Sequence, residues 1–271
     1  MSPPLTFLYA PADRPDRVRK ALESAADVVL ADLEDAVAPA RKDEARANVL
    51  ELLGSVSRLV QVRVNHPSTP WHEADLATVA SLPLEVGVRL PKVESPEEVL
   101  AVAAAVPGRA LHPLIESALG IERALEIATA SPRIASIGLG EADLRSDLGV
   151  SDDAGLTWAR SRVIVAARAA RLSPPAMSAY VNVRDLEGLA ASCRAGRALG
   201  FRGRTAIHPV QLETIRAAFL PTPQEVSRAR EVIARVAGAT AAGVGAIALA
   251  DGTFLDVAMV EQARTVLSLA E

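Results

Sequence analysis

Residues 27–35 read Asp27-Val28-Val29-Leu30-Ala31-Asp32-Leu33-Glu34-Asp35, a short apolar run that leads into closely spaced acidic side chains. A continuous apolar run of this length is typical of a strand buried on both faces of a parallel sheet. Side chains at the carboxyl end of such a strand lie where α/β proteins place their active sites. The stretch therefore predicts a buried strand over Val28–Leu33 and a chemically active edge directly after it.

Strand-like and helix-like segments alternate over most of the chain. The eight expected strands are Thr6–Ala10, Val28–Leu33, Leu59–Val64, Gly87–Pro91, Leu111–Ile115, Ile134–Leu139, Met177–Val181 and Thr205–His208. Helices are expected at Arg14–Ser24, Lys42–Leu53, Pro96–Ala105, Ile121–Ala130, Trp158–Arg171 and Leu186–Leu199. Such alternation predicts an α/β fold of the TIM or (β/α)8 barrel type, with an open sheet as the alternative. No glycine-rich fingerprint follows the first strand, which argues against a dinucleotide site.

The last part of the chain has a different pattern. Pro221-Thr222-Pro223 precedes a helix expected from about Gln224 to Val236, and a Gly/Ala-rich segment then leads to a final helix over Val257–Ala270. We expect a catalytic barrel domain over residues 1–220 and a C-terminal helical extension over residues 221–271.

Composition restricts the class of partner and the compartment. The 271 residues carry a net charge of −4, which argues against nucleic acid and anionic membranes as partners. No secretory signal pattern and no apolar run long enough to span a bilayer is present in the sequence. With Cys193 as the single cysteine, an intrachain disulfide is excluded. We expect a cytoplasmic protein.

Polar side chains follow neighbouring strands of the expected barrel. The set comprises Asp32, Glu34, Asp35, Arg63, Asn65, Lys92, Glu116, Glu141, Asp143 and His208. Mg²⁺ prefers oxygen ligands and usually takes one or two carboxylates from the protein. Glu116 and Asp143 follow adjacent strands and fit that requirement, while the acids at 32–35 could support them. The alternative is that some of these acids cap helices or pair with Arg63 and Lys92.

Two basic residues at the strand ends suggest electrophilic roles. A guanidinium at Arg63 suits a substrate carboxylate or a developing enolate oxygen, or else it is a structural partner of the acids at 32–35. Lys92 is the one reasonable candidate for a Schiff base. The four histidines lack metal-ligand spacing and no G-x-S-x-G motif is present, which argues against a zinc site and a serine hydrolase.

Six of these segments resemble, in the same order, the motifs of the citrate lyase beta-subunit-like family within the HpcH/HpaI aldolase/citrate lyase superfamily. They are Asp27–Val37, Val62–Asn65, Leu90–Glu94, Leu114–Ser117, Gly140–Leu144 and Ile207–Gln211. The resemblance runs from about residue 5 to the end of the chain and indicates a stand-alone member. It implies a TIM barrel in which Glu116 and Asp143 hold Mg²⁺ and Arg63 meets the substrate carboxylate or the thioester enolate.

The resemblance also implies a homo-oligomer, a trimer or a hexamer. In such assemblies an aspartate of the C-terminal segment reaches a neighbour's active site, and Asp256 matches that position, although it could instead cap the last helix. Arg14 and Arg17 are candidate contacts for the phosphates of coenzyme A, or they form a solvated helix face. Glu141 is an additional acid in its motif without an assigned role.

The function that follows is a Mg²⁺-dependent carbon–carbon lyase with a retro-Claisen mechanism. Its substrate would be a short 3-hydroxyacyl-CoA thioester such as citramalyl-, malyl- or citryl-CoA, which yields a 2-oxo acid or is formed from one. Glu116 would contact substrate through the metal, Arg63 would stabilise the enolate and Asp256 would move the proton. The alternatives are a citrate lyase beta subunit that uses a carrier-protein thioester, a thioester-independent pyruvate aldolase, and a metal-binding regulatory barrel.

Overall fold

The structure is a computed structural model that describes residues 4–241, 247–248, 254–255 and 257–270. It divides into two compact units, residues 4–216 and the described residues from 217 onward. Asp256, the expected proton-transfer residue, lies outside the described residues. No helix of the described ranges is both long and apolar enough to cross a membrane.

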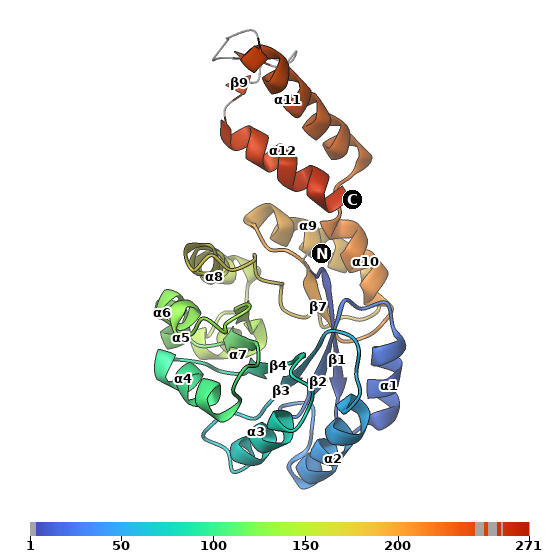
Figure 1. Cartoon of the computed structure of the whole chain (residues 1–271), viewed down its shortest axis with the longest axis vertical. Helices are drawn as coiled ribbons and strands as arrows, with labels where there is room; N and C mark the ends of the chain where they lie inside the picture. The colour runs from blue at the N-terminus through green and yellow to red at the C-terminus, as the bar shows by residue number, and fades with distance from the viewer. Residues whose placement is uncertain (1–3, 242–246, 249–253, 256, 271) are drawn as a thin grey trace. The chain divides into compact units, whose positions relative to one another are not determined.

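A curled parallel sheet forms the centre of the first unit (Figure 1). Its strands are β1 (Thr6–Pro11), β2 (Val28–Asp32), β3 (Val60–Arg63), β4 (Val86–Leu90), β5 (Leu111–Ile115), β6 (Gly138–Leu139) and β7 (Arg204–Ala206). They are ordered β6-β5-β4-β3-β2-β1-β7, and each neighbouring pair is parallel. Every residue of β2 and β4 is buried, as expected for strands that are covered on both faces.

Helices pack outside this sheet (Figure 1). They are α1 (Pro15–Glu23), α2 (Lys42–Leu53), α3 (His72–Ala80), α4 (Pro96–Ala105), α5 (Ala118–Glu122), α6 (Ala124–Thr129), α7 (Glu141–Leu148), α8 (Thr157–Ala169), α9 (Leu186–Leu199) and α10 (Gln211–Phe219). Local chemistry explains where some of them begin. Before α4, for example, the Ser95 side chain accepts a hydrogen bond from the Glu98 amide, and Pro96 occupies the first turn.

The expected eighth strand is the main difference from the prediction. Met177–Val181 is not a strand: only Met177 bridges to Arg204 of β7. The next residue, Ser178, instead contacts the start of the helix after β6, where its hydroxyl accepts a hydrogen bond from the Glu141 amide. The strand expected at Ile134–Leu139 shortens to β6. Within the described residues the sheet is therefore a seven-stranded half-barrel, and the predicted closed ladder is not formed.

The helix predictions also need correction in places. The helix expected at Ile121–Ala130 is two helices, α5 and α6, with a break at Arg123, and three helices (α3, α7 and α10) were not expected.

The second unit contains α11 (Pro223–Ala241), a short antiparallel pair of β8 (Ile247–Ala248) with β9 (Phe254–Leu255), and α12 (Val257–Ala270). A small apolar core there contains Ala229, Val232 and Ala263.

Candidate active site at the carboxyl end of the sheet

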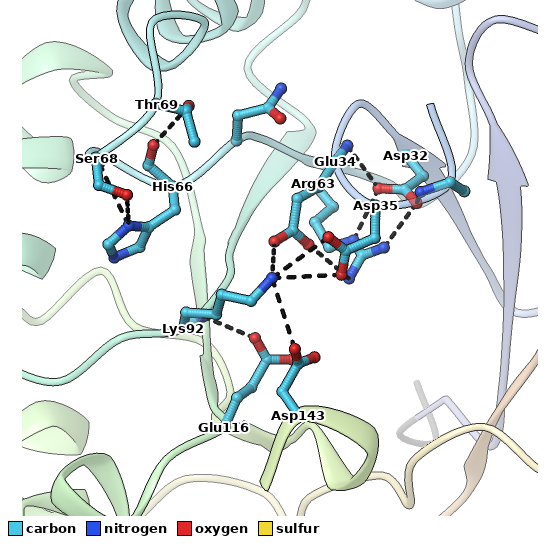
Figure 2. A network of polar contacts seen from close by, with 12 residues as sticks. Asp32, Glu34, Asp35, Arg63, His66, Ser68, Thr69, Lys92, Glu116 and Asp143 are labelled. Carbon is cyan, nitrogen blue, oxygen red and sulfur yellow. Dashed lines mark hydrogen bonds and ion pairs between the residues drawn. The ribbon is translucent and has the colours of Figure 1, made fainter. Parts of the chain in front are cut away.

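Five of the predicted side chains come together because their strands are parallel and end at the same edge of the sheet. Asp32 and Arg63 are the last residues of β2 and β3, Lys92 lies just beyond β4, and Glu116 directly follows β5. Asp143 lies in the first turn of α7, the helix that follows β6. Figure 2 shows these side chains in one network of polar contacts.

Arg63 is fixed by a two-pronged bond to Asp32. Its Nε and Nη2 donate to the two carboxylate oxygens of Asp32 at 2.8 and 2.7 Å, and its guanidinium lies 4.9 Å from the centre of the Tyr9 ring. Burial alone would lower the pKa of Arg63, but Asp32, Tyr9 and Glu34 together outweigh burial and the pKa is raised. Two of the five guanidinium N–H groups bond to Asp32, and Nη1 lies 2.7 Å from a Glu34 carboxylate oxygen, so the guanidinium is held from two sides.

Glu34 bridges the two bases of the site. Its carboxylate oxygens lie 2.7 Å from Arg63 Nη1 and 2.5 Å from Lys92 Nζ. Lys92 Nζ also lies 3.3 Å from Asp35 and 3.9 Å from Asp143. Burial opposes the charge on Lys92, but the hydrogen bond to Glu34 and the surrounding carboxylates raise its pKa. A lysine that stays protonated is a poor nucleophile, so the Schiff-base role loses its support.

Glu116 is the most perturbed carboxyl group of the site. It is 4 % exposed, and its pKa rises to about 7, first because it is buried and then because Glu34 and Asp143 add negative charge nearby. Lys92 adopts the left-handed backbone region (φ +53°), and its amide donates to Glu116 Oε2 at 2.8 Å. A Cβ atom on Gly140 would lie 1.9 Å from Glu116 Oε1, so only glycine leaves room for this carboxylate.

Asp143 completes the carboxylate pair. Its side chain is 42 % exposed, and Figure 2 shows its oxygens directed toward those of Glu116. No cluster of three or more Asp, Glu, His or Cys suited to a metal occurs in the described parts of the chain. Such a pair leaves coordination positions for water and substrate, as Mg²⁺ sites usually do.

Three predicted residues lie outside this network. Arg14 precedes α1 and is paired with the exposed Asp16 at 3.4 Å, and Arg17 is exposed on the same helix. Their contact with coenzyme A stays a prediction, as does the role of Asp256.

Lys42 is a site-supporting residue that the sequence reasoning missed. Its ammonium is buried and donates to the carbonyl oxygens of Leu33 and Glu34 and to Asn65 Oδ1, at 2.6, 2.8 and 2.7 Å. It thereby ties the turn after β2 to the turn after β3. A signal was present: Lys42 lies at helical spacing from buried Ala45, on the face of α2 that packs inward.

Comparison with known proteins gives consistent similarities. A profile of the HpcH/HpaI aldolase/citrate lyase family matches residues 5–209. The chain is 37% identical to the (3S)-malyl-CoA thioesterase of Cereibacter sphaeroides (strain ATCC 17029 / ATH 2.4.9), over 98% of this chain and 94% of that protein. It is 35% identical to the citrate lyase subunit beta of Leuconostoc mesenteroides subsp. cremoris, over 98% and 92%.

A solved structure shows the same similarity in three dimensions. The CitE protein from Mycobacterium tuberculosis, in complex with magnesium, acetoacetate and coenzyme A, superposes with a TM-score of 0.86. The two chains are 33% identical, and the match covers 98% of each. The similarity thus includes both compact units of the chain.

Proposed function

Since the chain belongs to the HpcH/HpaI aldolase/citrate lyase family, as its six motifs predict, we propose that it is a Mg²⁺-dependent carbon–carbon lyase. Its substrate is a short 3-hydroxyacyl-CoA thioester that is cleaved, or formed, by a retro-Claisen (or Claisen) reaction. The observation that carries the proposal is the pair of facing carboxylates, Glu116 and Asp143, beside the buried fork of Arg63.

The carboxylate pair fits a divalent cation. Burial, and then the charges of Glu34 and Asp143, raise the pKa of Glu116 to about 7, so a nearby positive charge would stabilise its ionised form. Gly140 keeps the space in front of the carboxylate free of a side chain. Glu116 and Asp143 would hold Mg²⁺, which supplies Lewis-acid polarisation of a substrate oxygen when bound.

Arg63 stabilises negative charge on the substrate. Asp32 holds the guanidinium in one orientation, so its remaining N–H groups are already aimed when charge develops on a thioester enolate oxygen. The protonated Lys92 holds Glu34 and offers its backbone amide to Glu116, which keeps the carboxylates in place. Asp32, Glu34, Asp35 and Lys92 therefore act as supporting residues.

Proton transfer is assigned to Asp256 of a neighbouring subunit in a homotrimer or hexamer. Changing Asp256 to Asn should abolish turnover and leave Mg²⁺ binding intact. Arg14 and Arg17, exposed beyond β1, would contact the phosphates of coenzyme A. A cytoplasmic location is part of the same proposal, because coenzyme A thioesters are intracellular metabolites.

We also propose that the catalytic unit, residues 1–220, works as a closed (β/α)8 barrel with residues 177–181 in the eighth strand position. Two contacts support this. Met177 bridges to Arg204 of β7, and Ser178 Oγ accepts a hydrogen bond from the Glu141 amide, just after β6, at 3.1 Å. The segment thus contacts β7 at one edge of the half-barrel and the start of the helix that follows β6 at the other.

A second candidate is hydrolysis of the thioester. The (3S)-malyl-CoA thioesterase at 37% identity supports it, because a thioesterase releases coenzyme A without cleaving the carbon chain. Activity on a carrier-protein thioester, supported by the citrate lyase subunit beta at 35% identity, is the third.

A product assay separates these activities. Citramalyl-, malyl-, citryl- and hydroxymethylglutaryl-CoA, and the same acyl groups on an acyl-carrier protein, are each incubated with the protein in Mg²⁺ or in EDTA. Pyruvate, glyoxylate, oxaloacetate, acetoacetate and free thiol are then measured. Carbonyl product that disappears with EDTA supports the lyase. Free thiol without carbonyl product identifies the thioesterase, and carbonyl release only from carrier-protein thioesters identifies the citrate lyase subunit.

A further inference from the structure

Glu141 has a buried partner on a different helix. Arg160 of α8 donates from Nε and Nη2 to the two oxygens of the Glu141 carboxylate at 2.8 and 2.7 Å. The two residues are 9 % and 8 % exposed. Arg160 also reaches Asp153 at 3.1 Å, so the guanidinium is held from two sides. The first residue of α7 is therefore anchored to α8 by a rigid, charge-assisted contact.

The helix geometry connects this anchor with Asp143. Successive residues of an α-helix are rotated by about 100°, so residues 141 and 143 point about 200° apart, in nearly opposite directions. Glu141 points outward to α8, and Asp143 points toward Lys92 and the Glu116 carboxylate. Fixing the rotation of this turn at Glu141 fixes the direction in which Asp143 leaves the helix.

Asp143 depends on such an anchor because its own side-chain contacts are weak. Its recorded ion pair, with Lys92 Nζ, is 3.9 Å long, and its side chain is 42 % exposed. α7 spans only eight residues, so little of its orientation comes from its own length. The Glu141 amide is also bonded to Ser178 Oγ, which holds the same turn from a second direction.

Stability alone does not explain the pair. A buried ion pair often contributes no more to folding than apolar residues of similar volume, because both charges lose water. What the pair does provide is a fixed orientation of the first turn of α7 relative to α8. We propose that the Glu141–Arg160 pair is a positioning device that aims Asp143 at Glu116, and this inference rests on the magnesium role proposed above for Asp143.

The test is calorimetric titration of the full-length protein with MgCl2 in the absence of substrate, combined with thermal unfolding. Glu141→Gln removes the charge but keeps the shape, and Arg160→Lys keeps the charge but loses the fork. We expect each to weaken Mg²⁺ binding by about 10- to 100-fold, the usual effect of changing a residue that orients a metal ligand. Arg160→Lys should have the smaller effect, since it retains one charged hydrogen bond.

Asp27→Asn is a matched control at the opposite end of the sheet. Asp27 also pairs with an arginine, Arg216, and the same carboxylate-to-amide change removes that pair. We expect it to lower the melting temperature and leave Mg²⁺ affinity within about 2-fold of wild type, since it lies at the amino end of β2. A loss of affinity in Asp27→Asn as large as in Glu141→Gln would attribute the effect to general destabilisation and overturn the positioning role.

Asp143→Asn separates this inference from the proposed function. If wild-type protein binds Mg²⁺ and Asp143→Asn does not, the metal assignment stands. Unchanged Mg²⁺ affinity in both Glu141→Gln and Arg160→Lys would then overturn the positioning role alone. If wild-type protein does not bind Mg²⁺, or Asp143→Asn binds it as well as wild type does, the metal assignment and the positioning role both fail.

Discussion

The two ends of the sheet use buried charge in opposite ways. At the carboxyl end, acids and bases neutralise one another and still leave an excess of acid beside Glu116. At the amino end, arginines donate to backbone carbonyl groups. Arg58 and Arg109 lie just before β3 and β5, and Arg133 precedes Ile134, which bridges to Leu111 of β5. All three reach carbonyls at or beyond the end of a helix.

The amino-end arginines satisfy groups that a helix leaves without partners. Arg109 is 2 % exposed and bonds to four carbonyl oxygens at and beyond the end of α3, namely those of Ala80, Leu82, Pro83 and Val86. Arg133 does the same for Ala103 and Val106 at the end of α4. The last carbonyls of a helix have no partner within it, so this arrangement removes an otherwise costly burial.

The difference separates stability from chemistry. Donors matched to acceptors stabilise the amino end, whereas like charges held close together destabilise the carboxyl end but can hold a cation. Active sites often carry such a conflict, and the remainder of the fold compensates for it. Substitutions at the two ends should therefore change activity and stability in different combinations.

The largest effect is expected for Glu116→Gln at the carboxyl end. Removing one of the two proposed magnesium ligands should lower kcat/KM by about 10³-fold or more, because the substrate oxygen loses its Lewis acid; this loss corresponds to about 4 kcal/mol. In the absence of metal, wild-type protein at pH 8 must keep an ionised Glu116 buried, whereas Gln carries no charge. The variant should therefore unfold with a free energy higher by on the order of 3 kcal/mol, as a pKa raised to about 7 implies. Kinetics and urea unfolding check both parts, and a variant that is inactive and less stable would contradict the comparison.

Arg109→Met at the amino end should show the reverse combination. Four carbonyl groups lose their shared donor, so we expect a loss of about 3 kcal/mol in unfolding free energy. Both kcat and KM should stay within about 2-fold of wild type at a temperature where the variant is folded. A large fall in kcat with normal stability would show that the amino end also takes part in the chemistry.

A pH series sharpens the contrast with one carboxylate from each end. Burial alone would raise the pKa of Asp27, but hydrogen bonds from Arg216, Leu5 and Thr6 outweigh it and lower the pKa. Asp27 therefore adds stability above its unfolded pKa near 4, and that contribution disappears as the pH falls through its folded pKa.

The pH dependence of the Glu116 contribution to stability has the opposite sign. Its folded pKa of about 7 lies above the unfolded value, so stability is lost as pH rises between about 4.5 and 7. In metal-free protein, Asp27→Asn should lower and Glu116→Gln should raise the melting temperature at pH 8. The Glu116→Gln difference should shrink toward pH 4. If both variants shifted the melting temperature in the same direction at pH 8, the contrast between the two ends of the sheet would be refuted.

The smallest effect is expected for the double variant Arg14→Gln/Arg17→Gln. Both side chains are exposed, so stability should stay within about 0.5 kcal/mol of wild type. If they contact the phosphates of coenzyme A, KM for the thioester should rise several-fold with kcat unchanged. An unchanged KM would leave the pair as a solvated helix face.

Much of this arrangement is predictable from local pattern. Buried strands such as β2 and β4 read as apolar runs, and the polar residues that follow them converge because parallel strands end together. Motif order then selects Arg63, Glu116 and Asp143 from many acids and bases. The chain does fold so that these residues meet at one edge.

Local sequence pattern does not show which distant strand or side chain a residue will contact. Met177–Val181 has strand-like residues, but whether it pairs depends on two sheet edges that are distant in sequence. Lys42 looks like a solvated residue at a helix start until the buried carbonyls around it are seen. The same holds for Glu141, whose partner Arg160 lies 19 residues away on another helix.

The pairing of β1 with β7 has a consequence for how the chain is made. Thr6 aligns with Arg204, so one of the two edges of β1 stays uncovered until nearly the whole unit has been synthesised. β2 can pair with the other edge early, because it follows after a single helix. Until β7 is made, β1 therefore presents an unpaired edge that could pair with another nascent chain.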